Sequence, residues 1–413
     1  MKIIAKKYFL FYVLLGLVII SSGCQGLARQ SDPKNDDEYV VILSLDAFRW
    51  DYPDIAKTPN LNSIAQNGVK AQVLIPCYPS KTFPNHYSMA TGLYPDNHGI
   101  VENRFFDPNL GFYSIGDRNA VENPAFYGGE PFWATAEAQG LIAATYFWVG
   151  SETAIGGSYP SFWKKYDSSV TMEQKIDTVI HWLNLPINER PRVIAWYSDE
   201  PDLTAHRNGA TGTKTIAVVE RLDSLLGVFL TQLNELPHAN KINFIVVSDH
   251  GMADISPSRY INLNKYVNRD WFSVISGGNP VYSLTPKAEY RDQAIAALKS
   301  IPNLKVWERH EVPKRLHYGS NPRIQDVIIE AEAGYSVGLS NDSSRYVGGA
   351  HGYDNENPDM HGIFFAQGPS FKKGYTSKSF INTNIYNIIT HILNLQPAKN
   401  DGNWDDVKDI FKN

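Results

Sequence analysis

Cysteine is nearly absent from this 413-residue sequence, which contains only Cys24 and Cys77. A small disulfide-rich scaffold is therefore excluded, because such folds need several bridges to replace a large core. The content of hydrophobic residues is 43%, which is enough for one large α/β domain, with or without an inserted lobe. We expect Cys77 to be a buried structural residue and the core, with or without bound metal, to stabilise the chain.

The sequence also lacks an excess of basic residues. It has 38 Lys and Arg against 43 Asp and Glu, and its formal net charge is -5. Dedicated nucleic-acid-binding domains usually carry a basic surface, so this composition argues against that class of protein. Small charged substrates remain compatible with it.

A long hydrophobic run occurs only near the N-terminus. Residues 1–24 have a Lys-bearing start, an apolar run over 8–20 and small residues before Cys24. This pattern predicts a secretory signal whose end resembles a bacterial lipobox, with an ordinary signal peptide or an uncleaved anchor as alternatives. The polar residues 25–38 are predicted to form a tether. We expect an exported protein, either periplasmic or anchored to the outer membrane by lipid at Cys24.

Internal repeats and low-complexity blocks are also missing from the rest of the chain. Short apolar runs alternate there with helical patterns, which predicts a doubly wound, mostly parallel sheet with helices on both faces. The expected strands are residues 39–45, 142–148, 193–197, 244–247 and 362–366, and the expected helices are 60–67, 171–183, 213–236 and 382–393.

One region departs from this alternation. Residues 256–342 contain apolar runs at 281–284, 304–308 and 326–331, with a helical pattern at 290–300. We predict a small α+β lobe inserted before the last core strand. The predicted catalytic domain, lobe included, spans 39–413.

Polar side chains stand where the predicted core strands end. In open α/β sheets, ligands gather outside the carboxyl ends of the strands. Asp46 follows the first run, SDEPDLTAH follows the run at 193–197, and SDHG follows the run at 244–247. The residues expected to converge are Asp46, Asp202, His206, Asp249, His250 and, from a loop before the last strand, His361.

Carboxylates and imidazoles together suit a divalent metal such as Zn²⁺. Six ligands are too many for one tetrahedral ion and divide into two sites of three, the arrangement used for phosphoryl transfer. Each residue alone has a simpler interpretation as a helix cap, a turn residue or a surface histidine. The combination favours a metal site.

The segment PSKTFPNHYSMATGLYPDNHGI at 79–100 contains Thr82 but no serine nucleophile elbow. Pro84 and Gly92 predict a short helix that begins at or just after Thr82. Thr82 then either caps this helix or, bound to a metal, attacks phosphorus at a helix terminus that favours phosphate. The second interpretation depends on the metal, because no Ser-His-Asp arrangement is visible.

Five segments resemble the nucleotide pyrophosphatase/phosphodiesterase family of the alkaline phosphatase superfamily, in its bacterial catalytic-core type. They are LSLDAFRWDY, PSKTFPNHYSMATGLYPDNHGIVENRFFDP, SDEPDLTAH, VVSDHGM and GGAHGYDNENPDMHGIFFAQGPSF, in the family's order from residue 43 to 371. The resemblance implies an alkaline phosphatase-like fold. It also implies hydrolysis of nucleotide phosphodiester or pyrophosphate bonds to release nucleoside monophosphates.

The resemblance assigns roles to individual residues. Thr82 would form a phosphothreonine-type intermediate, and Asn103 would donate a hydrogen bond to a phosphate oxygen. His86, His98 and His351 lie in the matching segments, and we interpret them as structural because they would overfill two metal sites. Two Zn²⁺ ions are implied, one held by Asp46, Thr82, Asp249 and His250 and the other by Asp202, His206 and His361.

The substrate pocket is predicted less directly. Phe83 and Tyr197 fall beside the expected site, and matching residues in the family stack on a nucleobase, although core packing is the alternative for both. Tyr166 and Ile115 are expected to extend this pocket.

An arginine is missing from the ligand motifs, and a bidentate arginine usually grips a phosphate monoester dianion. This absence favours a diester substrate. The alternatives are a lipid-headgroup, choline or sugar-nucleotide phosphodiesterase on the same core and an inactive surface lipoprotein that binds a ligand.

Overall fold

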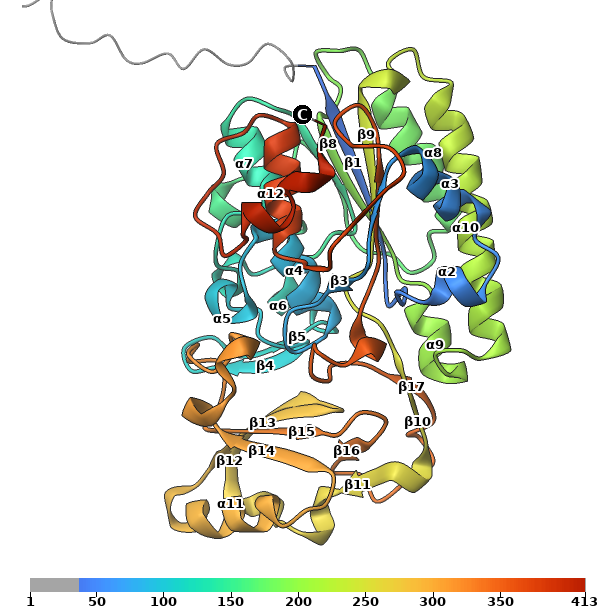
Figure 1. Cartoon of the computed structure of the whole chain (residues 1–413). Coiled ribbons are helices and arrows are strands. Elements are labelled where there is room, and N and C mark those ends of the chain that lie inside the picture. Colours follow the sequence, from blue (N-terminus) through green and yellow to red (C-terminus); the bar gives the residue numbers. More distant parts are fainter. Residues whose placement is uncertain (1–36, 413) are drawn as a thin grey trace, which may run out of the picture. The chain divides into compact units, whose positions relative to one another are not determined.

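The computed structural model describes residues 37–412, so the predicted signal, Cys24 and most of the predicted tether lie outside the described part. An eight-stranded sheet has the order β19-β2-β18-β9-β1-β8-β6-β7 (Figure 1). Every pairing is parallel except those of β18 with β9 and β2, so the predicted mostly parallel sheet is confirmed. The strands are β1 (Tyr39–Leu45), β2 (Val69–Ala71), β6 (Ala143–Tyr146), β7 (Phe162–Lys164), β8 (Val193–Ser198), β9 (Ile242–Val247), β18 (Phe364–Gln367) and β19 (Tyr375–Ser377).

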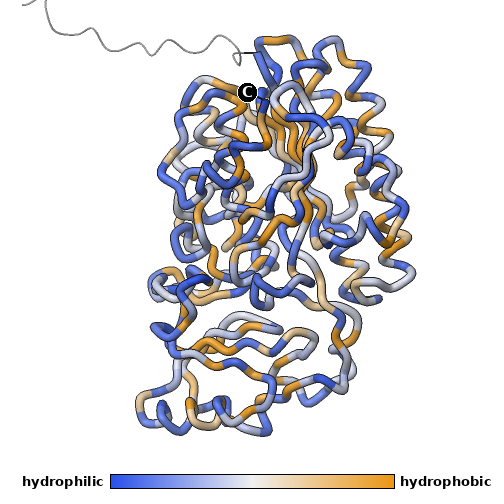
Figure 2. The backbone as a smooth tube through the Cα atoms, viewed as in Figure 1, coloured by the Kyte–Doolittle hydropathy of each residue, from blue (hydrophilic) through white to orange (hydrophobic). Residues whose placement is uncertain are grey.

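Helices cover both faces of this sheet because successive side chains of a strand point to opposite faces. In β1, Val40 and Ile42 belong to one hydrophobic cluster, and Val41 and Leu43 belong to the other. Figure 2 shows the resulting concentration of hydrophobic residues in the central strands. The first cluster is covered by α4 (Thr82–Thr91), α7 (Phe132–Ala138) and α12 (Asn384–Ile392), and the second by α3 (Pro59–Asn67), α8 (Met172–Leu183) and α10 (Thr213–Asn234).

The predicted core elements all occur, with ends that differ from the sequence expectation by no more than about two residues. Local signals explain several of these ends. Thr171 and Gln174 form a capping box at the start of α8. Gly92 ends α4 with a φ of 70°, a left-handed conformation that glycine adopts without strain.

The inserted lobe is a second sheet with the antiparallel order β12-β13-β15-β14 and one helix, α11 (Arg291–Lys299). Its α+β character agrees with the sequence expectation. The expectation missed β12, whose sequence FSVISGG has a mixed burial pattern and ends in two glycines. The lobe strands are β12 (Phe272–Gly278), β13 (Val281–Pro286), β14 (Leu304–Glu308) and β15 (Val327–Ala331).

Short elements connect and border these two sheets. They are α2 (Tyr52–Ile55), β3 (Leu74–Ile75), α5 (Pro95–His98), β4 (Arg104–Asp107), β5 (Gly111–Ser114), α6 (Arg118–Val121), α9 (Asp202–Asn208), β10 (Ala253–Ile255), β11 (Tyr260–Asn262), β16 (Ser336–Gly338), β17 (Gly348–Ala350) and β20 (Phe380–Ile381). Among them, β17 pairs with β10 and brings the end of the lobe insertion back to the core.

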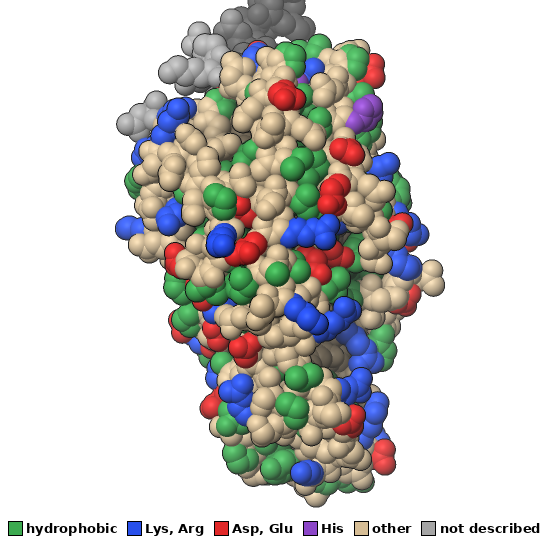
Figure 3. All heavy atoms as spheres, turned by 90° about the vertical axis from the view of Figure 1, so that its right-hand side faces the viewer, with side chains coloured by type: hydrophobic (Ala, Val, Ile, Leu, Met, Phe, Trp, Pro, Cys, Tyr) green, Lys and Arg blue, Asp and Glu red, His purple; other side chains and the backbone are tan. Residues whose placement is uncertain are grey.

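The surface and the single described cysteine give further information. Acidic and basic side chains both occur on the face in Figure 3, with hydrophobic side chains scattered between them. Over residues 37–412, no helix combines the length and the apolar composition that crossing a bilayer requires.

Cys77 is buried and unpaired in this part of the chain, as expected for a structural residue.

A buried carboxylate joins two of the covering helices. Asp223 of α10 accepts hydrogen bonds from the backbone N–H groups of Asn60 (3.1 Å) and Leu61 (2.9 Å) at the start of α3. The N-cap residue of α3, Thr58, makes no side-chain capping bond. Asp223 therefore caps α3 from another helix.

We predict that Asp223→Ala lowers the free energy of unfolding by about 1–3 kcal/mol, because it leaves buried donors without a partner. Urea denaturation followed by circular dichroism measures the change. The matched control is Glu220→Ala on the same helix, which removes only an exposed bond to the Lys57 N–H. It should lower the free energy of unfolding by less than Asp223→Ala does. Equal losses in the two variants would contradict the capping role.

Candidate active site

The carboxyl ends of three adjacent strands carry the predicted carboxylates, as the sequence indicated. Asp46 follows β1, and Asp249 and His250 follow β9. Asp202 opens α9 just after β8, and His206 lies one helical turn later on the same face. Asp46, Asp249 and His250 are almost completely buried, whereas the side chain of His206 is 39% exposed.

The first cluster gathers around the His250 ring. Its Nε2 atom lies 3.0 Å from Asp249 Oδ2, 3.3 Å from Thr82 Oγ1 and 3.5 Å from Asp46 Oδ1. These are the four residues predicted for one metal, and the structure brings them together.

The second cluster gathers around Asp202. Its Oδ1 atom lies 3.3 Å from His206 Nε2 and 3.6 Å from His351 Nε2. The His351 ring also stacks on His250, with centroids 3.7 Å apart, so the two clusters adjoin.

The carboxylate oxygens at the centres of these clusters fit a bound cation. Asp46 Oδ1, Asp202 Oδ1 and Asp249 Oδ2 are buried without a hydrogen-bond partner, although histidine nitrogens lie 3.0–3.6 Å away. Ligand atoms of a tetrahedral ion with bonds of about 2.1 Å are themselves about 3.4 Å apart. The spacing therefore fits atoms arranged around shared ions.

In each clustered histidine, the ring nitrogen that does not face the carboxylates bonds to a backbone carbonyl. Nδ1 bonds to a backbone carbonyl in His206 (Gly349, 2.8 Å), His250 (Gly251, 2.8 Å) and His351 (Ser80, 2.9 Å). A carbonyl only accepts, so Nδ1 carries the hydrogen and Nε2 is left with a lone pair. Metal-ligating histidines are commonly oriented in this way.

His361 does not join either cluster, and this corrects the sequence prediction. Its Nε2 faces the Asn355 carbonyl at 3.0 Å and must donate to it. His351, interpreted from sequence as structural, occupies the corresponding place beside Asp202 instead.

The local reason for this placement is the contact of β17 with α9. A Cβ on Gly348 would lie 2.2 Å from the His206 carbonyl oxygen, and Gly348 has a φ of +86°. Glycine at this position therefore allows the backbone of β17 to pass directly against α9, which carries His351 to Asp202. The GGAHG sequence was the signal for this close approach.

Two further histidines are structural, as predicted. His86 bonds through Nδ1 to the Thr82 carbonyl (2.9 Å) and through Nε2 to Ser44 Oγ (2.8 Å). His98 bonds through Nε2 to Ser88 Oγ, and its Nδ1 accepts from the Ile100 N–H. Both ring nitrogens of each residue are thus occupied.

Electrostatics also indicate unmatched negative charge. Burial, together with Asp249 and Asp202, raises the pKa of Asp46 well above its usual value. Burial likewise raises the pKa of Asp202, against the opposing effect of His206. Burial would raise the pKa of Asp249 too, but His250 and His86 hold it well below its usual value. Cations at the clusters would offset this concentration of carboxylates.

Thr82 begins α4, as predicted, but the helix terminus offers few free N–H groups. The Phe83 N–H donates to Asn103 Oδ1 at 3.0 Å, and Pro84 has no N–H. The start of the helix therefore has fewer backbone N–H groups available to bind phosphate than the sequence led us to expect. Because Oδ1 of Asn103 is occupied, its amide Nδ2 is the end left to donate to a substrate.

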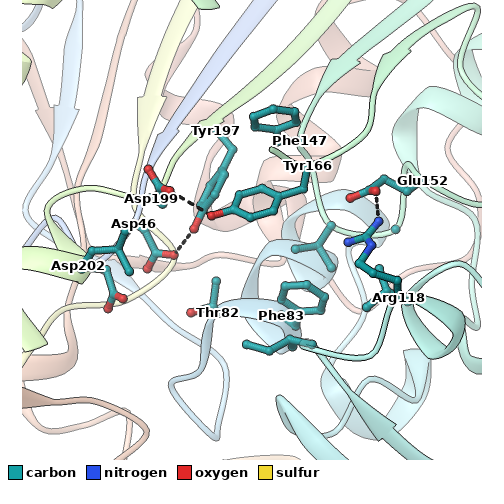
Figure 4. A pocket seen from close by; sticks show the side chains of 15 residues that line it. Asp46, Thr82, Phe83, Arg118, Phe147, Glu152, Tyr166, Tyr197, Asp199 and Asp202 are labelled. Atoms are coloured by element: carbon teal, nitrogen blue, oxygen red, sulfur yellow. Dashed lines mark hydrogen bonds and ion pairs between the residues drawn. The ribbon is translucent and has the colours of Figure 1, made fainter. Parts of the chain in front are cut away.

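A pocket opens beside Thr82, and all four predicted pocket residues line it: Phe83, Ile115, Tyr166 and Tyr197. Figure 4 shows Phe83 and Tyr166 on opposite sides of the space, with Asp46 and Asp202 at one end and Arg118 at the other. The sequence did not indicate Arg118, Phe147, Glu152 or Asp199, which also line the pocket.

Tyr197 also contacts the first cluster from the pocket wall. Its hydroxyl donates to Asp46 Oδ2 at 2.6 Å, and its ring packs edge-on against His86 with centroids 5.0 Å apart. Tyr197 therefore fixes the orientation of Asp46 from the pocket wall.

A family model described as type I phosphodiesterase / nucleotide pyrophosphatase matches residues 40–354. The chain belongs to this family. It is 36% identical over 384 residues to venom phosphodiesterase CdcPDE of Crotalus durissus collilineatus, covering 91% of this chain and 46% of that protein. With human ectonucleotide pyrophosphatase/phosphodiesterase family member 1 the identity is 36% over 389 residues, or 91% and 42% of the two chains. The chain thus spans about half the length of the curated relatives it matches.

Solved structures of the family share the fold. Murine ectonucleotide pyrophosphatase/phosphodiesterase 5, solved as an inactive variant in complex with AMP, superposes with a TM-score of 0.87 at 32% sequence identity. The match covers 91% of this chain and 100% of the other. The human member 5 gives a TM-score of 0.86 at 32% identity. The alkaline phosphatase-like α/β fold implied by the sequence is confirmed.

The two candidate ligands His351 and His361 can be separated by experiment. We predict that His351→Ala lowers bound metal from about two ions per chain to about one, because the Asp202 cluster loses a donor. His361→Ala is the matched control and should retain both ions, since its ring bonds to Asn355. Metal analysis after dialysis of zinc-loaded protein measures the content. Loss of metal from His361→Ala with full retention in His351→Ala would contradict the assignment.

Proposed function

We propose that this protein is a dizinc nucleotide pyrophosphatase/phosphodiesterase that releases nucleoside monophosphates through a covalent intermediate on Thr82. The observation that carries this proposal is the position of the Thr82 hydroxyl. It lies 3.3 Å from His250 Nε2, among buried carboxylate oxygens without hydrogen-bond partners, and it faces an aromatic pocket. A binding protein would not need this combination.

The donor set divides between two Zn²⁺ ions. When bound, these ions supply positive charge that lowers the pKa of a coordinated hydroxyl or water and offsets charge on the phosphoryl oxygens. One ion would be held by Asp46, Thr82, Asp249 and His250, and the other by Asp202, His206 and His351.

The chain's own residues orient the reaction. The Thr82 hydroxyl loses its proton to solvent and attacks phosphorus from the start of α4, breaking the bond from phosphorus to the oxygen of the leaving alcohol or phosphate. Water then attacks the phosphothreonine, which releases the nucleoside monophosphate and restores Thr82. The bond between the Thr82 carbonyl and His86 fixes the position of this residue. Asn103 donates through Nδ2 to a phosphoryl oxygen, since the Phe83 N–H holds its other end. Tyr197 maintains Asp46 in its orientation.

The pocket favours a diester over a monoester. Arg118 lines it, but its guanidinium is already paired with Glu152 and, at 3.2 Å, with Glu122. Lys81 adjoins Thr82, but its ammonium donates to the Asn279 carbonyl at 2.6 Å. Arg118 lies at the end of the pocket away from Asp46 and Asp202 (Figure 4), and Lys81 is held by a carbonyl, so neither is placed to grip the second charge of a monoester. Asn103 is neutral.

The far end of the pocket suits a nucleoside. Phe83 and Tyr166 lie on opposite sides of the space (Figure 4), so a planar base that enters between them contacts an aromatic face on each side. The complex of murine member 5 with AMP supports a nucleotide as the ligand. A dinucleotide or nucleotide ester would thus bind with its nucleoside here and its phosphoryl group at Thr82.

We also propose that the enzyme is exported and held at a membrane by lipid on Cys24. The signal-like residues 1–24 support this, as do the printed names of relatives, which describe venom enzymes and ectonucleotide enzymes. Labelling with a palmitate analogue would detect the anchor, and its loss in Cys24→Ser would verify the site.

The proposed substrate class is tested with a panel on the zinc-loaded protein. We expect kcat/KM for the thymidine 5′-monophosphate p-nitrophenyl ester to exceed that for p-nitrophenyl phosphate by roughly 10²-fold or more, because no free cation grips a dianion. Bis-p-nitrophenyl phosphate and glycerophosphocholine complete the panel. Higher turnover of the monoester would overturn the diesterase proposal, and preference for glycerophosphocholine would overturn the nucleotide assignment.

The nucleophile is tested by Thr82→Ala. We expect kcat/KM for the nucleotide ester to fall by roughly 10³-fold or more, since the attacking oxygen is removed. The control Thr82→Ser keeps a hydroxyl and should retain measurable turnover. Stopped-flow kinetics and mass spectrometry of acid-quenched protein detect the phosphorylated residue. Near-normal turnover by Thr82→Ala with intact zinc content would refute the covalent mechanism.

A further inference from the structure

Asp199 lies in the pocket outside the two candidate metal clusters of the described residues. It directly follows Ser198, the last residue of β8, and is thus carried by the rigid central sheet. Its Oδ2 atom accepts a hydrogen bond from the Tyr166 hydroxyl at 3.0 Å, drawn as a dashed line in Figure 4. The contact joins residues 33 positions apart in the chain.

Tyr166 needs such a contact because its own segment provides little support. It follows the edge strand β7 in a stretch without helix or strand, and its side chain is 40% exposed. One side of the ring packs against Phe147 in a T-shaped contact with centroids 5.2 Å apart. The hydroxyl bond to Asp199 is therefore the polar contact that holds the outer end of the ring in place.

We propose that Asp199 is a positioning residue that holds Tyr166 as one wall of the nucleoside-binding part of the pocket. This inference rests on the proposed nucleotide function. It goes beyond that function because it assigns substrate selection to a residue that touches neither the metals nor, in this role, the base.

The charge on Asp199 is supported from behind the pocket. Lys175 of α8 is buried, and its ammonium lies 5.2 Å from the centre of the Phe147 ring, on which Tyr166 packs. Burial lowers the pKa of Lys175, and the charge of Asp199 opposes this shift. Lys175, Phe147, Tyr166 and Asp199 thus form one continuous supporting wall.

The direction of the hydrogen bond is fixed over the working pH range. Burial and the neighbouring Asp199 raise the pKa of the Tyr166 hydroxyl, so it remains protonated and donates. An Asn side chain at 199 retains an oxygen acceptor of similar shape, whereas Ala removes it. Comparing the two variants shows whether the acceptor oxygen or the negative charge of Asp199 holds Tyr166.

The expected effect is on substrate binding. Asp199→Ala should raise KM for the thymidine 5′-monophosphate p-nitrophenyl ester by about 5- to 20-fold, with kcat changed less than about 2-fold. The segment is not released entirely, because Lys165 still pairs with Glu122 at 2.5 Å. The KM of Asp199→Asn for the same ester should stay within about 3-fold of that of the unmodified enzyme.

A double-mutant cycle tests whether Asp199 acts through Tyr166. Tyr166→Phe keeps the ring and removes only the hydroxyl, so it should raise KM as Asp199→Ala does. The double variant should then be no worse than either single variant, because both remove the same bond. Fully additive effects on KM would overturn the proposal.

Bis-p-nitrophenyl phosphate, which has no nucleoside, provides the second readout. Its kcat/KM should change less than about 2-fold in Asp199→Ala, and zinc content should stay the same. An equal loss on both substrates would show that Asp199 supports the metal site and would overturn the proposal.

Phe83→Ala separates failure of this inference from failure of the proposed function. If it raises KM for the nucleotide ester while Asp199→Ala does not, the nucleoside pocket stands and the positioning role of Asp199 is wrong. If neither Phe83→Ala nor Asp199→Ala distinguishes the nucleotide ester from bis-p-nitrophenyl phosphate, the nucleotide assignment itself is wrong.

Discussion

Three buried carboxylates that meet at one sheet edge are the constraint on which this structure depends. Asp46, Asp202 and Asp249 each direct an oxygen without a hydrogen-bond partner toward the same small volume. Such crowding of like charges is unfavourable without cations, and a flexible chain would relax away from it. Parallel strands buried on both faces prevent this relaxation, because their hydrogen bonds and core packing fix the strand ends.

A second layer of contacts converts these strand ends into oriented ligands. Carbonyl groups fix the tautomers of three histidines, and the Ala47 N–H binds Asp249 Oδ1 at 3.1 Å. Ala47 has a φ of 54°, an uncommon value for a residue other than glycine, and this turn aims its N–H across the site. Tyr197 supplies the corresponding bond to Asp46. The site is thus preorganised by backbone groups from several elements.

Sequence reasoning succeeded where the chemistry follows a strand directly. Asp46, Asp249 and His250 were predictable because periodicity identifies buried strands and the topology fixes which ends converge. It failed for His351 and His361, since both belong to the same matching segment and only the path of β17 against α9 decides which ring reaches Asp202. The paired glycines of GGAHG signal a close approach, but not which histidine it delivers to Asp202.

The pocket shows the same division between predictable and unpredictable features. Phe83 adjoins Thr82 in sequence and was therefore readily expected, whereas the contact of Tyr166 with Asp199 joins two segments far apart in the chain. The paired charges of Arg118, which begins α6, and Glu152, which lies in a turn, likewise meet from separate segments. Periodicity carries no information on such contacts, because they depend on how irregular segments pack after the core has formed.

The two ends of the pocket consequently differ in how they are built. At the metal end, sheet strands and buried polar contacts fix Asp46 and Thr82, so a substitution there disturbs several partners together. At the nucleoside end, Tyr166 stands on an irregular segment and is oriented by one hydrogen bond and one ring contact. Changes at this end alter fewer contacts and leave the strand-end ligands in place. The architecture would therefore allow substrate preference to change while the proposed chemistry of phosphoryl transfer is retained.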